Sequence, residues 1–151
     1  MILLIAAVAV GAGYLIYRAL LPKSDKLLEQ YHAFTATIDQ ARYQTNAGYR
    51  WEVDEELRVR QVALASAYIA DNRPDEAIAL LEGLIAAMNK QQYVLKKRIR
   101  RNSGQVELVA IYYQRLADAY GLKHDEKKKA WARQKSDEYK AEAASLEKRG
   151  R

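Results

Sequence analysis

The first 21 residues are the part of this sequence that most restricts its architecture. They read MILLIAAVAVGAGYLIYRALL and contain no charged residue before Arg18. About 20 helical residues, at about 1.5 Å each, cover the hydrocarbon core of a bilayer. A secretory signal peptide would begin with basic residues and would end in a small-residue cleavage site. Nothing basic precedes this run, so we predict that residues 1–21 form an uncleaved transmembrane anchor.

The flanking charges predict the orientation of this anchor. Arg18, Lys23 and Lys26 all follow the apolar run, and positive charges stay preferentially on the cytoplasmic side. We therefore expect a single-pass protein of the bacterial inner membrane that contacts the lipid bilayer and has a cytoplasmic C-terminal domain. Small residues at four-residue spacing are typical of contacts between transmembrane helices, although they are also common in isolated spans; here they are Ala7, Ala9, Gly11 and Gly13.

The rest of the chain has the periodicity of helices. Its two prolines, Pro22 and Pro74, lie where helices are expected to begin or end. Residues 22–49 are predicted to be a linker and an N-terminal helix, capped by Ser24, whose apolar face is Leu27, Tyr31, Phe34, Ile38 and Ala41. The segment Asn46–Arg50 is expected to break this helix.

Residues 50–148 are predicted to hold four further helices, at about 51–70, 74–88, 106–120 and 125–146. Apolar residues recur there every three or four positions, and no segment alternates as a strand would. We therefore predict an all-α protein, with a transmembrane helix followed by an antiparallel helical domain of about five helices.

The segment around Tyr68 resembles a tetratricopeptide repeat (TPR), a unit of two antiparallel helices. The first helix of such a repeat carries a large apolar residue, a small one and an aromatic one; the second carries a small residue and then large apolar ones. The matching residues are Leu64, Ala65, Tyr68, Ala77, Leu81 and Leu84. The best repeat spans residues 58–91, and the resemblance implies that these side chains pack its two helices together.

A degenerate second repeat is expected at about residues 110–144. Leu116, Ala117 and Tyr120 match the first-helix pattern, but Ala130 follows the tyrosine by ten residues where the family has nine. Its second helix is poor in apolar residues, as a terminal helix facing solvent would be. A generic antiparallel helical bundle would show much the same core pattern.

In the TPR family the first helices line a concave groove that takes a peptide or a helix. The matching positions, which the resemblance implies to be the partner-binding groove, are Val59, Val62, Ser66, Ile69, Ile111, Gln114 and Asp118. Repeats that hold carboxylates have cationic and amide side chains there, because a buried carboxylate needs paired donors. This sequence has valines, which suit an amphipathic helix. The alternative is that a flanking helix of the same chain already fills the groove.

A basic cluster between the two repeats is a candidate contact for anionic surfaces. It consists of Lys96, Lys97, Arg98, Arg100 and Arg101. Such a cluster can meet the phosphates of anionic lipid or nucleic acid, or an acidic partner. No nucleic-acid-binding signature accompanies it, so anionic lipid or an acidic partner is favoured over a nucleic acid. The alternative is a solvated helix end.

Nothing in the sequence indicates catalysis. There are no cysteines and two histidines, His32 and His124, which lie far apart without a metal-binding spacing. We predict no catalytic or metal-binding residue, no cofactor and no small-molecule substrate.

The function that fits these features is a non-enzymatic, membrane-anchored protein-interaction module. It would be a scaffold, an assembly factor or an accessory subunit of a larger membrane complex. The alternative is a receptor or chaperone-like TPR protein that captures amphipathic segments of translocating proteins, similar in layout to a small mitochondrial import receptor. A membrane-tethered nucleic-acid binder is the least favoured hypothesis.

Overall fold

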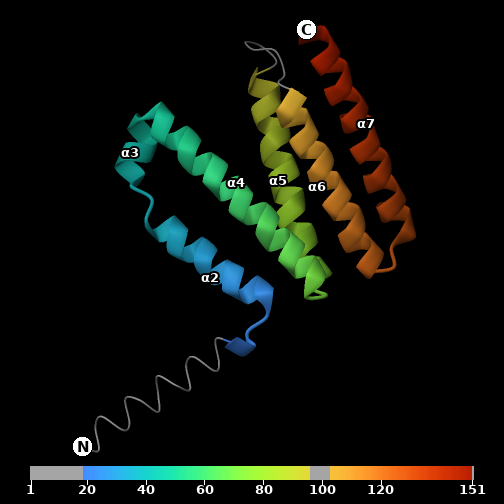
Figure 1. The fold of residues 1–151 in the computed structure, drawn as a ribbon, viewed down its shortest axis with the longest axis horizontal. Coiled ribbons are helices and arrows are strands. Elements are labelled where there is room, and N and C mark those ends of the chain that lie inside the picture. Colours follow the sequence, from blue (N-terminus) through green and yellow to red (C-terminus); the bar gives the residue numbers. More distant parts are fainter. Residues whose placement is uncertain (1–18, 96–102, 151) are drawn as a thin grey trace, which may run out of the picture.

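The computed structural model describes residues 19–95 and 103–150, and within them the fold is all-α (Figure 1). Six helices and no strand are present in these ranges, which confirms the predicted class. The helices are α2 (Lys23–Ala36), α3 (Gln40–Thr45), α4 (Ala47–Ala70), α5 (Pro74–Leu95), α6 (Ser103–Leu122) and α7 (Glu126–Gly150).

The helix expected between residues 22 and 45 is divided into α2 and α3. The interruption follows from capping: the Asp39 carboxylate accepts a hydrogen bond from the Arg42 backbone nitrogen at 3.0 Å, which starts a new helix there. Asn46 acts in the same way one helix later, because its side chain accepts from the Tyr49 backbone nitrogen at 2.9 Å. The segment Asn46–Arg50 therefore separates two helices as expected, but most of it is the first turn of α4.

Two helical hairpins form the main body of the domain. The helices α5, α6 and α7 lie side by side, and α4 runs obliquely to them (Figure 1). It meets α5 at the 71–73 turn and diverges from it toward its own N-terminus. Helix α2 packs along α4 on the side away from α7.

The α4–α5 and α6–α7 hairpins are closed by turns of the same geometry. Asn72 and His124 both have a φ of 56°. In the first turn the Arg73 nitrogen donates to the Tyr68 carbonyl at 2.8 Å, and in the second the Asp125 nitrogen donates to the Tyr120 carbonyl at 3.1 Å. The two hairpins therefore share a backbone conformation at equivalent positions.

The core lies where α4, α5, α6 and α7 converge. Ala65 of α4 and Leu81 of α5 are both fully buried, in one cluster with residues of α6 and α7. Helix α7, which is mostly polar, is attached by small and aromatic groups: the buried Ser136 hydroxyl donates to the Ala110 carbonyl at 2.9 Å, and the Tyr139 ring stacks on Tyr113 at 5.6 Å between centroids. An aromatic contact of this kind adds about 0.5–1.5 kcal/mol beyond the area it buries.

The structure contradicts the predicted localisation as a single-pass membrane protein. Within residues 19–95 and 103–150, every helix is too short or too polar to cross a bilayer. The physical reason is that the long helices α4–α7 are amphipathic: each buries one face against its neighbours and leaves charged residues on the other. The anchor was predicted at residues 1–21; residues 1–18, including the small residues Ala7, Ala9, Gly11 and Gly13, lie outside the described residues.

Candidate protein-binding groove

The residues predicted to pack the repeats lie almost all inside the protein. Nine of them are buried: Leu64, Ala65, Tyr68, Ala77, Leu81, Leu84, Leu116, Ala117 and Tyr120. Ala130, the tenth, is exposed.

Helix α7 faces α6 through a different set of small residues. Ala132, Ser136 and Ala143 are buried and recur at spacings of four and seven residues, which places them on one side of the helix. This spacing of small residues was the signal in the sequence that could have identified the buried face. Ala130 was selected because it is a small residue within one position of the family's spacing from Tyr120.

The residues predicted to line the groove divide into three environments. Val59 of α4 and Ile111 of α6 are exposed, at 58% and 40% of their surface. Val62 and Ile69 are partly buried, each against one of the two core clusters. The remaining three, Ser66, Gln114 and Asp118, are of intermediate exposure.

The C-terminal part of the predicted groove is occupied from within the chain. Ile69 packs against the cluster that contains Leu64 and Tyr68, and so do Leu27 and Leu28 of α2. Of the four predicted groove residues on α4, Val59, near the middle of the helix, is the most exposed.

A cavity of about 280 Å³ lies where the N-terminal half of α4 faces α5 and α6. Helix α4 contributes Trp51, Glu55 and Arg58, α5 contributes Met88, and α6 contributes Gly104, Gln105 and Leu108. Trp51 is 66% exposed. We call the surface formed by this cavity together with Val59 and Ile111 the α4–α6 groove.

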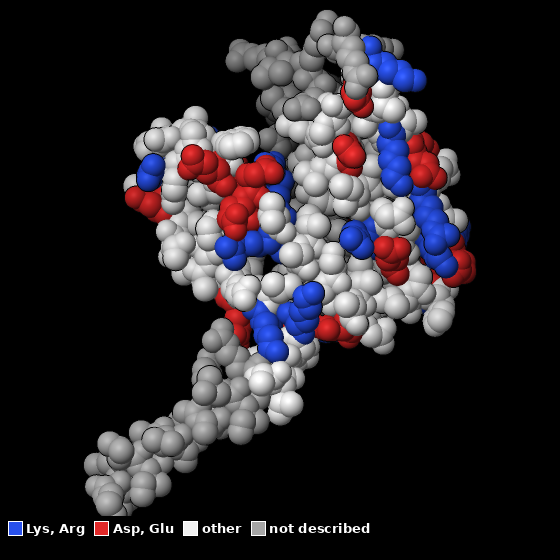
Figure 2. All heavy atoms as spheres, in the orientation of Figure 1, with Lys and Arg blue, Asp and Glu red and all other residues white. Residues whose placement is uncertain are grey.

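Helical spacing brings the members of the groove together. Residues 51, 55 and 58 follow one another along one side of α4, and residues 104, 108 and 111 do so on α6. Figure 2 shows that the surface is hollowed between the part built from α2, α3 and the first half of α4 and the part built from α5, α6 and α7. Acidic and basic side chains lie together on the α4 side of this hollow.

The charges at the cavity are paired, but two buried polar atoms, one on α4 and one on α6, are not. Arg58 and Glu55 form an ion pair of 2.5 Å. The Tyr112 hydroxyl and the Arg58 Nε are buried and have no hydrogen-bond partner within the described part of the chain. The pKa of Tyr112 is raised to about 12, mainly by burial. The positive charge of Arg58 lowers this pKa and the negative charge of Glu55 raises it, both by less than burial does. Arg58 and Glu55 both line the cavity, whereas Tyr112 is not among its lining residues.

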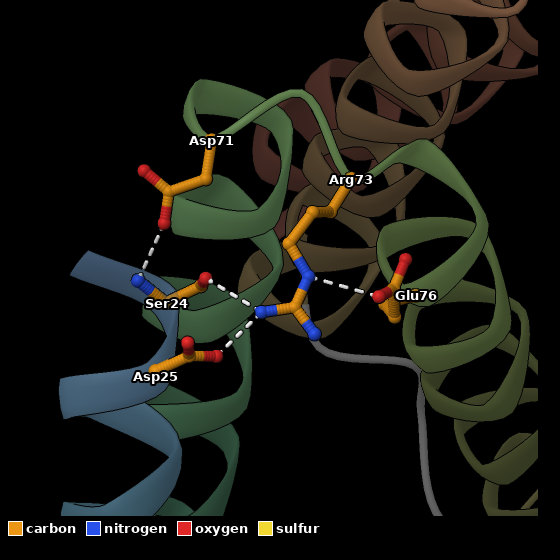
Figure 3. A network of polar contacts seen from close by, with 5 residues as sticks. All are labelled: Ser24, Asp25, Asp71, Arg73 and Glu76. Carbon is orange, nitrogen blue, oxygen red and sulfur yellow. Dashed lines mark hydrogen bonds and ion pairs between the residues drawn. The ribbon is translucent and has the colours of Figure 1, made fainter. Parts of the chain in front are cut away.

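A polar network that the sequence did not indicate fixes α2 against the hairpin turn (Figure 3). Ser24 does not cap α2 with its side chain: Pro22 is the N-cap residue, and the Ser24 nitrogen donates to Asp71 Oδ2 at 2.7 Å. Arg73, from the turn, reaches Ser24 Oγ at 3.2 Å, Asp25 at 2.5 Å and Glu76 at 2.9 Å. Apart from the contact between Arg73 and Glu76, these contacts join residues 47 to 49 positions apart, and no local pattern in the sequence indicates them.

The predicted basic cluster lies beyond what the structure describes. Lys96, Lys97, Arg98, Arg100 and Arg101 all fall within residues 96–102. In the ranges 19–95 and 103–150, no group of three His, Asp or Glu side chains is placed to hold a metal ion.

Comparison with known proteins identified no relative of this chain. No family model, curated protein or solved structure matches this chain.

Proposed function

We propose that this chain is a non-enzymatic protein-interaction module, acting as a scaffold, an assembly factor or an accessory subunit of a larger protein complex. It binds an amphipathic helix of its partner in the α4–α6 groove. One observation carries this proposal: the exposed Trp51 lines a cavity of about 280 Å³ between α4, α5 and α6, and two further large apolar side chains, Val59 and Ile111, are exposed on α4 and α6.

The composition of the groove suits a protein partner. Tryptophan and arginine are the residues that most often dominate binding energy at interfaces, and Trp51 and Arg58 are both present. An amphipathic helix buries its apolar face in such a groove through residues one turn apart. Val59 and Ile111 would meet one apolar residue of that helix, and the cavity would take another.

The groove is held by rigid elements, which lowers the cost of binding. Ala65 of α4 and Leu116 of α6 are buried in the same core cluster, so the two walls cannot separate freely. The equal turns at Asn72 and His124 support a TPR-like relationship between the two hairpins. In that arrangement α4 and α6 are the first helices of successive repeats, and α2 caps the first one.

The test is co-purification of the full chain from its own cells, with native gel analysis and mass spectrometry of what accompanies it. The matched variants are Val59→Asp with Ile111→Asp in the groove, and Arg133→Asp on the exposed side of α7. One dominant partner at fixed ratio that is lost only with the groove variant supports an accessory subunit.

Two other outcomes would lead to a different conclusion about the function. A changing set of clients, also lost with the groove variant, would favour the receptor or chaperone-like role. A monomer, or partners that the groove variant retains, would contradict binding in the groove altogether.

A further inference from the structure

Arg58 differs from the other arginines in its part of the chain because no aromatic ring lies over it. Five arginines are present between residues 42 and 73. In four of them the guanidinium carbon is 4.4–5.9 Å from the centroid of a tyrosine or phenylalanine ring; these are Arg42, Arg50, Arg60 and Arg73. Within residues 19–95 and 103–150, no ring has this position over Arg58. Because the face of an aromatic ring attracts a guanidinium group, Arg58 can still accept such a contact from another molecule.

Arg60, on the same helix, shows the contact that Arg58 lacks. Both arginines form an ion pair with a glutamate one turn before them, Arg58 with Glu55 at 2.5 Å and Arg60 with Glu56 at 2.7 Å. Both also have a buried Nε without a hydrogen-bond partner in the described part of the chain. Arg60 lies over the ring of Phe34, at 4.6 Å from its centroid, whereas Arg58 lines the cavity of about 280 Å³. The same side chain in the same local setting therefore meets a ring in one case and a cavity in the other.

Two other residues that line the cavity also suit an aromatic occupant. Met88, which is buried, belongs to the residue type whose sulfur makes favourable contacts with aromatic rings. Trp51 adds an aromatic side chain of its own, and aromatic pairs are favourable beyond the area that they bury. The lining of the cavity thus offers three kinds of side chain that interact with a ring more favourably than with an aliphatic group of the same size.

The charge and the size of the cavity restrict the occupant further. The charge of Arg58 is already matched by Glu55, so a charged occupant would find no opposite charge to offset its burial. A single water molecule needs about 10–15 Å³ of such a cavity, and this cavity, at about 280 Å³, has room for a whole side chain. The occupant that fits is therefore a large neutral side chain.

We propose that the cavity between α4, α5 and α6 takes a phenylalanine side chain of the docked helix, with its ring over the guanidinium of Arg58. The ring would lie against Trp51 and Met88, and it would stand to Arg58 as Phe34 stands to Arg60. The partner is then an amphipathic helix that carries an aromatic residue on its apolar face. This inference rests on the proposed docking of a helix in the α4–α6 groove.

The test uses three helical peptides of leucine and alanine with balanced lysine and glutamate on the solvent face. They are identical except for a central phenylalanine, cyclohexylalanine or alanine. Cyclohexylalanine has a saturated ring of the same size, which is at least as apolar but has no aromatic face. The chain has two tryptophans, so the full chain with Trp131→Phe leaves Trp51 as the only tryptophan reporter, at the groove.

We expect the phenylalanine peptide to bind about five- to tenfold more tightly than the cyclohexylalanine peptide, because only the aromatic ring interacts with the guanidinium and the indole through its face. The alanine peptide should bind most weakly, since it leaves the cavity empty. Burial of apolar area alone would make cyclohexylalanine at least equal to phenylalanine.

Three variants test whether the preference comes from the cavity. Arg58→Met removes the guanidinium and keeps an unbranched side chain; it should abolish the preference for phenylalanine over cyclohexylalanine. The matched control is Arg60→Met, which removes the guanidinium that lies over Phe34 and should keep the preference. Leu108→Phe should fill part of the cavity from within and abolish the preference as well. This third variant provides the answer if circular dichroism shows that Arg58→Met is unfolded.

The outcomes separate this inference from the function on which it rests. If the phenylalanine and cyclohexylalanine peptides bind equally, the aromatic site is wrong and the groove still docks helices. The same conclusion follows if Arg58→Met and Arg60→Met change the preference to the same extent. If no peptide changes the emission of Trp51, both the site and the docking groove are contradicted.

Discussion

The backbone nitrogen of Ser24 donates a hydrogen bond to the carboxylate of Asp71, at 2.7 Å across 47 positions of sequence. This bond connects the first turn of α2 to the turn between α4 and α5 (Figure 3). Arg73 reinforces it by contacting Asp25 and Glu76 from the same turn. The position of α2 along α4 is therefore set by polar contacts at one end and by partly buried apolar residues along its length.

Replacing Asp71 by alanine should loosen α2 without unfolding the core. The substitution removes the acceptor for the Ser24 nitrogen, so we expect hydrogen exchange of α2 amides to become about three- to tenfold faster. Exchange in α5, α6 and α7 should not change. The control is Asp137→Ala, at an exposed carboxylate on α7; if both variants accelerate exchange in α2 equally, the contact does not hold the helix.

Acid should release α2 before the rest of the domain. Hydrogen bonds from Ser24 lower the pKa of Asp71, and the hydrogen bond from Arg73 lowers the pKa of Glu76. A carboxylate whose pKa is lowered on folding stabilises the protein above its unfolded pKa, about 4, and loses this effect as the pH falls through the folded value. Hydrogen exchange of α2, corrected for the intrinsic rate, should therefore increase selectively below about pH 4. A selective increase that Asp71→Ala left unchanged would show that Asp71 is not involved.

Truncating Leu81 should destabilise the whole domain. Leu81 is fully buried in the cluster shared by α4, α5, α6 and α7, and Leu→Ala at such positions costs about 2–5 kcal/mol of unfolding free energy. Urea denaturation followed by circular dichroism measures this loss. Val59→Ala, at an exposed apolar position, should change the same free energy by no more than about 0.5 kcal/mol. Similar losses of unfolding free energy in the two variants would show that Leu81 does not belong to the core.

Alkaline pH should destabilise the domain through two tyrosines. Burial raises the pKa of Tyr112 to about 12, and burial with the hydrogen bond to Glu82 raises that of Tyr120 to about 12. Unfolded tyrosine ionises near pH 10, so stability is fully present below about pH 10 and is lost as the pH rises toward the folded values. The urea concentration at the midpoint of unfolding should fall with rising pH, and it should fall less steeply in Tyr112→Phe than in the unchanged protein. Ultraviolet titration that showed every tyrosine ionising near its ordinary pKa would contradict this explanation.

The parts of the fold that follow from local pattern were predictable from the sequence. Pro74 marks the start of α5, and the spacing of Leu64, Ala65 and Tyr68 identified residues that are buried. These patterns depend on one helix burying one face. The division between α2 and α3 was missed because a single capping residue, Asp39, outweighs a continuous apolar periodicity.

The candidate site was predictable only in part. Val59 and Ile111 were identified by repeat position, and both are exposed on neighbouring helices. The cavity was not identified, because it depends on the oblique path of α4 relative to α5 and α6, which the residue spacing within a single helix does not indicate. The contact of Ser24 with Asp71 was also missed, because a polar contact between residues far apart in the sequence produces no periodic pattern in it.

The measurement that tests the central claim most directly is photo-crosslinking from inside the groove. A benzophenone amino acid replaces Val59 in one variant of the full chain and Arg133, on the exposed side of α7, in another. After irradiation in the chain's own cells, mass spectrometry identifies each adduct and the residue attached. A helix-docking groove predicts one recurrent adduct from position 59, attached to the apolar face of a helical segment, and no such adduct from position 133. Equal labelling from both positions, or none from position 59, would contradict it.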